Sequence, residues 1–318
     1  MKALMVTAPG AAEVIEVPRP APQIGEVLVR VSQCNTCPQW DLHLAANEPM
    51  FVGHQFHYPY TLGQPGHEMV GTVEAVGDGV VGFDRGAKVA AWRDAGHQRQ
   101  GCYAEYVAVA AENLLLVPDH LADSRVASLE LAMCVAVSVL PLLKLDAIAG
   151  QSAAVNGLGP AGLIAAQMLR AEGAASVVGF EPNLGRREAA LGWAVDAACD
   201  PREPATAEQF PDRGRIEVAI DCVGFPAAVR WLMDRVRRHV ALFAVQRHDY
   251  TYALGHAGLT VIGYEGHHRA AAEYALGLIV AGKVDLAPLV SVELPFERYV
   301  EGVELLRRQE ACKIGFRW

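Results

Sequence analysis

The sequence predicts an α/β protein of two domains, one a barrel or sandwich of β-strands and the other a parallel sheet covered by helices. Three observations carry this prediction. The chain has 318 residues, of which 52% are hydrophobic, and this is enough for two cores of ordinary size. Short apolar runs separated by glycine fill the first part, to about residue 110. After about residue 150, strand-like and helix-like runs alternate.

The first part is β-rich because its valine and alanine runs are short and are bounded by Gly and Asp. Examples are EVLVRVSQC, MVGTVEAVGDGV, AKVAAW and YAEYVAV. Strands of this length are typical of a barrel or a sandwich. The pattern changes near residue 120, where RVASLELAMCVAVSVLPLLKL carries apolar residues at helical spacing.

The middle part alternates strands with helices. It reads SAAVNG, LIAAQMLRAEG, SVVGFEP, GRREAALGWAV, IEVAIDCVG, AAVRWLMDRV and HVALFAV. Such an alternation predicts a parallel sheet with helices on both faces. The last segment, VSVELPFERYVEGVELLRRQEACKIGFRW, predicts a strand, a helix and a strand that close one of the two domains.

Composition excludes several classes of protein. The net charge of −9 argues against nucleic-acid binding, which needs a basic face. The longest uncharged stretch, residues 147–169, is interrupted by glycines and a proline, so we expect no membrane span. The start, MKALMVTAPG, lacks the features of a signal peptide. Seven scattered cysteines do not form a disulfide framework, and we expect a cytoplasmic protein with free or metal-bound thiols.

A glycine-rich turn predicts dinucleotide binding. Gly157, Gly159 and Gly162 form G-x-G-x-x-G between a strand and a helix. The first glycine permits a tight turn, the second lets the backbone approach a pyrophosphate, and the third lets the helix pack on the strand. The free N–H groups of the helix N-terminus face the phosphates. The predicted cofactor-binding residues of the turn are Gly157, Leu158, Gly159, Pro160, Ala161 and Gly162.

Glu181 ends the next strand, 19 residues after Gly162, where an acid accepts both ribose hydroxyls. Its charge favours NAD, because it repels a 2′-phosphate. Arg186 and Arg187 follow, and paired arginines are able to hold such a phosphate, so NADP stays open as the alternative.

Cys37, His67 and Glu68 combine a thiolate, an imidazole and a carboxylate, which suit a catalytic zinc ion. Such an ion acts as a Lewis acid on an alcohol or carbonyl oxygen. Cys34 and Cys37 form a C-x-x-C without a second pair, so a structural four-cysteine zinc site is not expected there.

The stretch GHEMVGTVEAVGDGVVGFDRGAKVAAW, residues 66–92, resembles the zinc signature of the medium-chain dehydrogenase/reductase family, which includes the zinc alcohol and sorbitol dehydrogenases. Gly71, Gly77 and Val80 fall at the family's spacing. The opening MKAL, the segment EVPRPAPQIGEVLVRV, Cys37 before Asp41, the turn GLGPAG and the ending IGFRW are similar to the family in the same order. The resemblance therefore extends over nearly the whole chain.

This resemblance implies a GroES-like β-barrel catalytic domain and a Rossmann domain, which is a doubly wound parallel sheet. The catalytic domain would comprise residues 1–125 and 285–318, and the Rossmann domain residues 126–284. The active site would lie in the cleft between them.

The resemblance also implies roles for single residues. Cys37, His67 and Glu68 would be metal ligands, with Glu68 binding directly or exchanging with water. Glu130 would be the fourth, since it stands where sugar-alcohol members carry Glu-Pro-Leu, although Leu131 replaces the proline here. Cys134 is a rival by chemistry alone.

Two further residues, with Glu68, complete the expected catalytic set. Asp41 would hold the ring of His67 by a hydrogen bond, and His43 would carry a proton between the bound alcohol and solvent. One departure affects this relay, because the Asp follows Cys37 by four residues and the family's usual Ser or Thr is missing. Gln39 or Trp40 must take that place.

Other departures concern the metal content and the substrate pocket. The family's lobe of four clustered cysteines is absent, and only Cys102 remains between Trp92 and Tyr103, so a single catalytic zinc is expected. The loop before Gly66 carries His54, His57 and several aromatic residues, which either shape an unusual pocket or pack as a surface loop.

The expected function is that of a zinc-dependent oxidoreductase transferring a hydride between a nicotinamide cofactor and an alcohol, polyol or sugar-like substrate. Its cofactors would be Zn²⁺ and NAD, with NADP possible. A metal-free quinone or alkene reductase and a non-catalytic NAD(P)H-binding sensor are the alternatives. Its partner would be a small-molecule substrate, with no nucleic acid or membrane. Self-association as a homodimer or homotetramer is expected, with the apolar segment at residues 242–266 supplying a sheet edge.

Overall fold

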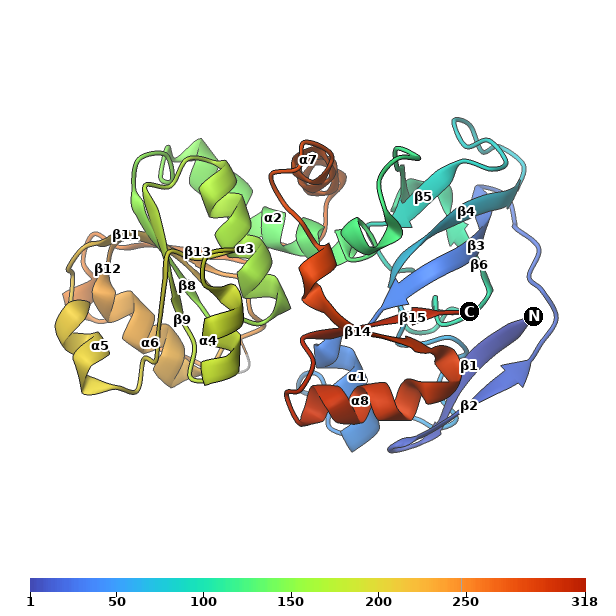
Figure 1. The fold of residues 1–318 in the computed structure, drawn as a ribbon, viewed down its shortest axis with the longest axis horizontal. Coiled ribbons are helices and arrows are strands. Elements are labelled where there is room, and N and C mark those ends of the chain that lie inside the picture. Colours follow the sequence, from blue (N-terminus) through green and yellow to red (C-terminus); the bar gives the residue numbers. More distant parts are fainter. Residues whose placement is uncertain (247) are drawn as a thin grey trace. The chain divides into compact units, whose positions relative to one another are not determined.

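The computed structural model describes residues 1–246 and 248–318. The chain forms two compact units, residues 1–131 with 285–318, and residues 132–284. Each unit is built around its own main sheet, as the ribbon in Figure 1 shows.

The first unit contains a seven-stranded mixed sheet in the order β14-β15-β3-β4-β5-β7, with β6 also paired to β3. Strand β3 is the centre of this sheet, because it pairs antiparallel with β4, β6 and β15. The strands are β3 (Glu26–Asn35), β4 (Glu68–Val76), β5 (Lys88–Ala91), β6 (Tyr106–Ala110), β7 (Leu114–Leu116), β14 (Val290–Pro295) and β15 (Lys313–Arg317).

Two further strands and two α-helices complete this unit. Strands β1 (Lys2–Ala8) and β2 (Ala11–Glu16) form an antiparallel pair. Helices α1 (Pro38–Ala46) and α8 (Tyr299–Arg307) lie side by side, as Figure 1 also shows. The short 3₁₀ turns are η1 (Ala111–Asn113), η2 (Asp123–Arg125), η4 (Ala287–Leu289) and η5 (Phe296–Arg298).

The core of the first unit joins segments from both ends of the chain. Val27, Val29 and Val31 of β3 point to one side, as the period of two requires, and all are buried. Phe316 of β15 is fully buried and stacks on Phe296 with 5.3 Å between ring centroids. The C-terminal strand is therefore packed into the same core as β3.

The second unit is a six-stranded sheet in the order β10-β9-β8-β11-β12-β13, in which every neighbouring pair is parallel. The chain winds outward from β8 in one direction and from β11 in the other, so the order reverses between these two strands. The strands are β8 (Ser152–Asn156), β9 (Ser176–Phe180), β10 (Ala197–Cys199), β11 (Ile216–Asp221), β12 (Val236–Leu242) and β13 (Thr260–Gly263).

Helices cover both faces of this sheet, with α3 and α4 on one side and α6 on the other in Figure 1. The predicted doubly wound parallel sheet is therefore confirmed. The helices are α3 (Pro160–Ala171), α4 (Leu184–Ala190), α5 (Pro204–Gln209), α6 (Pro226–Arg235), α7 (Arg269–Val280) and the 3₁₀ turn η3 (Leu254–His256).

Helix α2 (Leu129–Lys144) is the apolar helix expected before the sheet. Together with the turn before it, the segment Asp123–Lys144 is long and apolar enough to cross a membrane, but 78% of its most apolar stretch is buried in the fold. This burial is typical of the core helix of a globular domain.

Candidate metal centre and dinucleotide site

Three predicted metal ligands meet at one end of β3 in the first unit. Cys37 follows β3 and is the N-cap residue of α1, while His67 and Glu68 lie where β4 begins. Asn35 of β3 pairs with Glu68 of β4, so the two segments reach this point together. One ligand atom from each of Cys37, His67 and Glu68 lies within 4.8 Å of the others. This is the spacing of groups that bind one ion.

His67 is oriented by the backbone. Its Nδ1 lies 2.8 Å from the carbonyl oxygen of Pro65. An N–H at this position donates to the carbonyl, which leaves the lone pair of Nε2 for a metal. The Nε2 atom lies 3.7 Å from Oε2 of Glu130, and the two side chains are only 6% and 8% exposed. The structure therefore places Glu130, at the start of α2, beside His67.

Anionic groups surround the His67 ring. Burial lowers the pKa of His67, but its hydrogen bond to Cys37 and the charges of Cys37, Glu130 and Glu68 raise the pKa well above its usual value. Anions around the ring favour a positive charge at this place, which either a proton or a metal cation supplies.

Glu68 contacts a residue that the sequence analysis missed. Its Oε1 accepts a hydrogen bond from Nζ of Lys313 at 2.6 Å, and both side chains are fully buried. Burial lowers the pKa of Lys313, but the charges of Glu68 and Cys37 outweigh it and raise the pKa. Oε2 of Glu68 is buried and has no hydrogen-bond partner among the described residues. A lysine inside the apolar C-terminal run was the available sequence signal.

These residues fit a zinc ion. A thiolate, an imidazole whose Nε2 faces a carboxylate, and two carboxylates are all groups that zinc binds. Oε2 of Glu68 supplies a donor that no described residue uses, whereas nearly all buried polar atoms are bonded.

The hydrogen-bond partners of Asp41 differ from the expected contact with His67. This carboxylate is fully buried in α1 and accepts hydrogen bonds from the hydroxyls of Tyr103 and Tyr299, at 3.1 and 2.8 Å. Desolvation raises the pKa of Asp41 to about 6, although both tyrosines lower it. The prediction that Asp41 holds the His67 ring is wrong, because the Asp41 side chain faces these tyrosines and the Pro65 carbonyl takes the Nδ1 hydrogen.

His43 and Gln39 are partners on α1. Nε2 of His43 lies 3.0 Å from the Gln39 amide nitrogen, and Nδ1 lies 3.1 Å from the carbonyl oxygen of Glu48. In this arrangement Nδ1 donates to the carbonyl and Nε2 accepts from the amide. The half-buried ring thus contacts Gln39, one of the two residues expected to replace the missing hydroxyl.

Trp40, the other residue expected in that place, belongs to an aromatic cluster. It stacks on His97 with 3.6 Å between ring centroids and meets His54 edge to face. Nδ1 of His97 lies 3.0 Å from the hydroxyl of Tyr60, and burial lowers the pKa of His97 to about 4. His54 therefore packs in this cluster, whereas His57 is exposed. Sequence reasoning missed His97, which stands in the short loop where only Cys102 was noted.

Cys34 and Cys102 of the first unit are not part of the group formed by Cys37, His67 and Glu68. Cys34 is fully buried and Cys102 is 7% exposed, and desolvation raises the pKa of Cys102 to about 12. Within residues 1–246 and 248–318, no group of four cysteines collects around one point. In the second unit, Sγ of Cys134 lies 3.3 Å from Nε2 of His267.

The glycine turn of the second unit has the geometry expected for a dinucleotide. Gly157 has a φ of +89°, which favours glycine. A Cβ on Gly162 would lie 1.8 Å from the carbonyl oxygen of Gly157, so α3 packs directly on the turn. At Gly159 a Cβ would meet no atom within 4 Å, which leaves open space at the helix N-terminus. The turn and α3 lie where the strand order reverses, the usual place for a ligand.

Leu158, Pro160 and Ala161 complete this turn. Pro160 is the first residue of α3, a position where a proline costs no hydrogen bond. The backbone N–H of Leu158 donates to Oε2 of Glu181 at 3.0 Å. Glu181 follows β9 and is 6% exposed, so the structure joins the predicted acid to the predicted turn.

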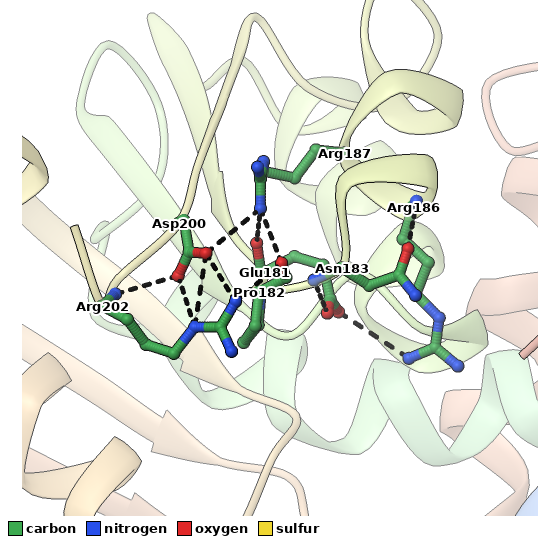
Figure 2. A network of polar contacts seen from close by, with 7 residues as sticks. All are labelled: Glu181, Pro182, Asn183, Arg186, Arg187, Asp200 and Arg202. Carbon is green, nitrogen blue, oxygen red and sulfur yellow. Dashed lines mark hydrogen bonds and ion pairs between the residues drawn. The ribbon is translucent and has the colours of Figure 1, made fainter.

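Figure 2 shows how the arginines near Glu181 are engaged. Nη1 of Arg187 donates to the carbonyl oxygens of Glu181 and Pro182, each at 2.8 Å. It also lies 3.6 Å from Asp200. Arg186 has a looser contact, with Nη1 3.8 Å from Oε2 of Glu181. The geometry thus leaves Arg186 more available to a ligand than Arg187.

Comparison with known proteins agrees with both units. Residues 23–119 match the family described as alcohol dehydrogenase GroES-like domain, so the predicted GroES-like domain is confirmed. The L-threonine 3-dehydrogenase of Pyrococcus horikoshii is 28% identical, over 99% of this chain and 98% of its own length. That of Proteus mirabilis is 24% identical over 94% of each chain.

Solved structures share the whole fold. The 2R,3R-butanediol dehydrogenase from Bacillus subtilis superposes with a TM-score of 0.84 at 23% identity, covering 100% of this chain and 99% of its own. The alcohol dehydrogenase TADH from Thermus sp. ATN1 gives 0.83 at 24% identity, covering 100% of both chains. The chain therefore carries an alcohol dehydrogenase GroES-like domain, resembles L-threonine 3-dehydrogenases over almost its whole length and shares the fold of an alcohol dehydrogenase.

Proposed function

We propose that this protein is a zinc-dependent dehydrogenase that transfers a hydride between a nicotinamide cofactor and an alcohol, polyol or sugar-like substrate. The observation that carries the proposal is the group of Cys37, His67 and Glu68, in which Glu68 keeps one buried oxygen without a partner among the described residues. The glycine turn joined to Glu181 supports the nicotinamide part. As part of this proposal, catalysis belongs to residues 1–125 with 285–318, joined by Glu130, and dinucleotide binding belongs to the rest of residues 126–284.

In this proposal Cys37, His67 and Glu130 hold the metal, and Glu68 is the fourth, exchangeable ligand. A zinc ion held there supplies a Lewis acid, which makes an alcohol hydroxyl easier to deprotonate. The Pro65 carbonyl fixes the tautomer of His67, which leaves Nε2 as the atom that would bind the ion. The buried surroundings of Glu68 and Glu130 exclude bulk water and strengthen each of these contacts.

In this proposal, residues of α1 carry the proton. His43 is half-buried and contacts Gln39 through Nε2, which is the atom that would take up the proton released by the alcohol. Asp41 acts at one remove, since its bonds to Tyr103 and Tyr299 fix α1 and with it Cys37. This role replaces the expected contact between Asp41 and His67.

NAD is the proposed cofactor, and NADP is expected to bind more weakly. Glu181 is held at the end of β9 with its carboxylate on the turn, where it repels a 2′-phosphate and accepts ribose hydroxyls. Arg187 donates through Nη1 to two carbonyls, and this engagement within the protein supports the same preference.

The proposed substrates carry a secondary alcohol. The curated relatives are named for oxidation at carbon 3 of threonine, and one structural neighbour for a 2,3-diol. The test is a panel containing L-threonine, 2,3-butanediol, galactitol 1-phosphate and benzyl alcohol, each with NAD. We expect reduced nicotinamide to accumulate with at least one of the secondary alcohols. Its absorbance measures this accumulation. Binding of NADH without turnover of any alcohol or carbonyl would contradict the proposal.

Self-association and location are also part of the proposal. Strand β13 is an edge of the parallel sheet, and Val245, Tyr252 and Leu254 nearby are 64%, 51% and 92% exposed. Residue 247 of this segment lies outside the described residues. We propose a cytoplasmic homodimer or homotetramer formed through this edge. Light scattering at two concentrations tests it, and monomer at both would contradict it.

A further inference from the structure

Lys313, which forms a fully buried pair with Glu68, has no role in the proposed reaction so far. Lys313 enters this site from the far end of the chain. Gly315 of β15 pairs with Asn35 of β3, and Asn35 also pairs with Glu68 of β4. The three strands therefore bring the ammonium group and the carboxylate to the same end of β3.

Stability alone does not account for this pair. Both side chains are 0% exposed, and removing two charges from water costs about as much as their attraction returns. A hydrophobic pair of similar size would serve the fold as well. Furthermore, only Oε1 of Glu68 is bonded, and Oε2 is left buried without a partner among the described residues.

The charges around the site favour the same explanation. Ionised Cys37, Glu68 and Glu130 carry three negative charges, and the ammonium of Lys313 carries one positive charge. The buried carboxylate of Asp41 acts on Lys313 as well, so the site holds an excess of negative charge that a divalent cation offsets. Without Lys313 that excess would be larger by one charge in surroundings of low dielectric.

We propose that Lys313 is a positioning residue that holds Oε1 of Glu68 and thereby limits Glu68 to a single, exchangeable contact with the metal through Oε2. This inference rests on the proposed function, because it requires the metal. A carboxylate held at one oxygen cannot bind with both, and its attraction to the cation is weakened by the neighbouring ammonium. Lys313 thus keeps one metal position open to exchange with water or substrate.

The experiment measures zinc release from the full-length protein. Wild type and Lys313→Met are loaded with one equivalent of zinc and mixed with excess colorimetric chelator. We expect Lys313→Met to release zinc at least tenfold more slowly, because Glu68 is freed to bind fully and the repulsion is removed. A residue that only supported the fold would give the opposite result, faster release. Lys313→Arg, which keeps the charge, is the matched control and should stay close to wild type.

A second background separates positioning from simple repulsion. In Glu68→Gln the carboxylate is absent, so adding Lys313→Met should change the release rate by less than threefold. An equal slowing in both backgrounds would overturn the positioning role. Glu68→Gln by itself should release zinc at least tenfold faster than wild type, and this holds as a test even if Lys313→Met fails to fold. Release at the wild-type rate from Glu68→Gln would overturn the inference.

Cobalt substitution gives an independent reading. The visible spectrum of the cobalt-loaded wild type should change when azide is added, whereas that of Lys313→Met should not, because Glu68 occupies the position. An azide response of equal size in both proteins would contradict the inference and leave the proposed function intact. A wild type that binds no zinc would instead overturn the proposed function itself.

Discussion

At the scale of single residues, the metal proposal depends first on Cys37. Replacing Cys37 by Ser removes a thiolate ligand, so zinc occupancy should fall and turnover should drop by more than about 100-fold. Even the loss of a residue that only hydrogen-bonds a metal ligand lowers affinity or activity by roughly 10–100-fold. NADH binding should be unchanged, because the glycine turn belongs to the other unit. Steady-state kinetics and fluorescence titration with NADH measure the two effects.

The matched control for this substitution is Cys199→Ser, which changes a partly buried cysteine on β10. It should keep both zinc and turnover. Normal turnover in Cys37→Ser would remove Cys37 from the ligand set.

His97 gives a prediction about stability and pH. Burial lowers the pKa of His97 to about 4, so between pH 6.5 and 4 the unfolded chain binds a proton that the folded chain does not. Stability therefore falls as the pH falls through this window, and His97 should account for about 2 kcal/mol of loss between pH 7 and pH 5.

His97→Phe keeps an aromatic ring against Trp40 and should flatten this dependence. Urea unfolding at pH 7 and pH 5 measures it, with the exposed His57→Phe as the control. A His97→Phe protein that loses the same stability as wild type between the two pH values would contradict the assignment.

At the scale of elements, the turn before α3 provides two contrasting substitutions. Gly162→Ala places a Cβ 1.8 Å from the Gly157 carbonyl oxygen, so α3 must move and the protein should melt at a lower temperature. Gly159→Ala meets no atom within 4 Å and should melt as wild type does.

Both variants should bind NADH more weakly, but for different reasons. In Gly159→Ala the added methyl group occupies the space proposed for the pyrophosphate, while in Gly162→Ala the turn itself is displaced. Thermal melting and NADH titration separate the two. Unchanged NADH affinity in Gly159→Ala would show that the turn does not approach the phosphates.

Glu181, at the end of β9, predicts the choice between cofactors. Glu181→Gln removes the charge that repels a 2′-phosphate and weakens the contact with the turn. The ratio of NAD to NADP affinity should fall by about tenfold or more, since a hydrogen bond to a charged group contributes roughly 1.5–3 kcal/mol. The exposed Glu188→Gln on α4 is the control. A ratio that stays at the wild-type value would place cofactor selection elsewhere.

The glycine turn and Glu181 show which features could be predicted from the sequence. Gly157, Gly162 and Glu181 were predictable because the turn, helix and next strand follow one another along the chain, and local spacing determines their geometry. Lys313 was not, because its contact with Glu68 depends on which strand pairs beside β3, and the two residues stand 245 positions apart.

Asp41 marks a different limit. Its position in the chain suggested a contact with His67, but the partners of a buried carboxylate depend on which hydroxyls reach it, and Tyr299 comes from α8. His97 was missed for a similar reason, since nothing in the loop 93–102 indicates that its ring stacks on Trp40.

At the scale of the whole molecule, the chain combines two units with separate tasks in the proposed reaction. The first gathers metal donors from the starts of α1, β4 and α2, and the second presents a helix N-terminus at the reversal of its strand order. The alternation of strands and helices made the second unit predictable, whereas the closure of the first by the C-terminal strand left two possibilities in the sequence.

The measurement that tests the central claim most directly is the zinc content of the purified wild-type protein, prepared without chelators and determined by elemental analysis. The account predicts about one zinc per chain, bound by Cys37, His67, Glu130 and exchangeably by Glu68. Protein that folds, binds NADH and carries no zinc, even after incubation with the metal, would contradict it.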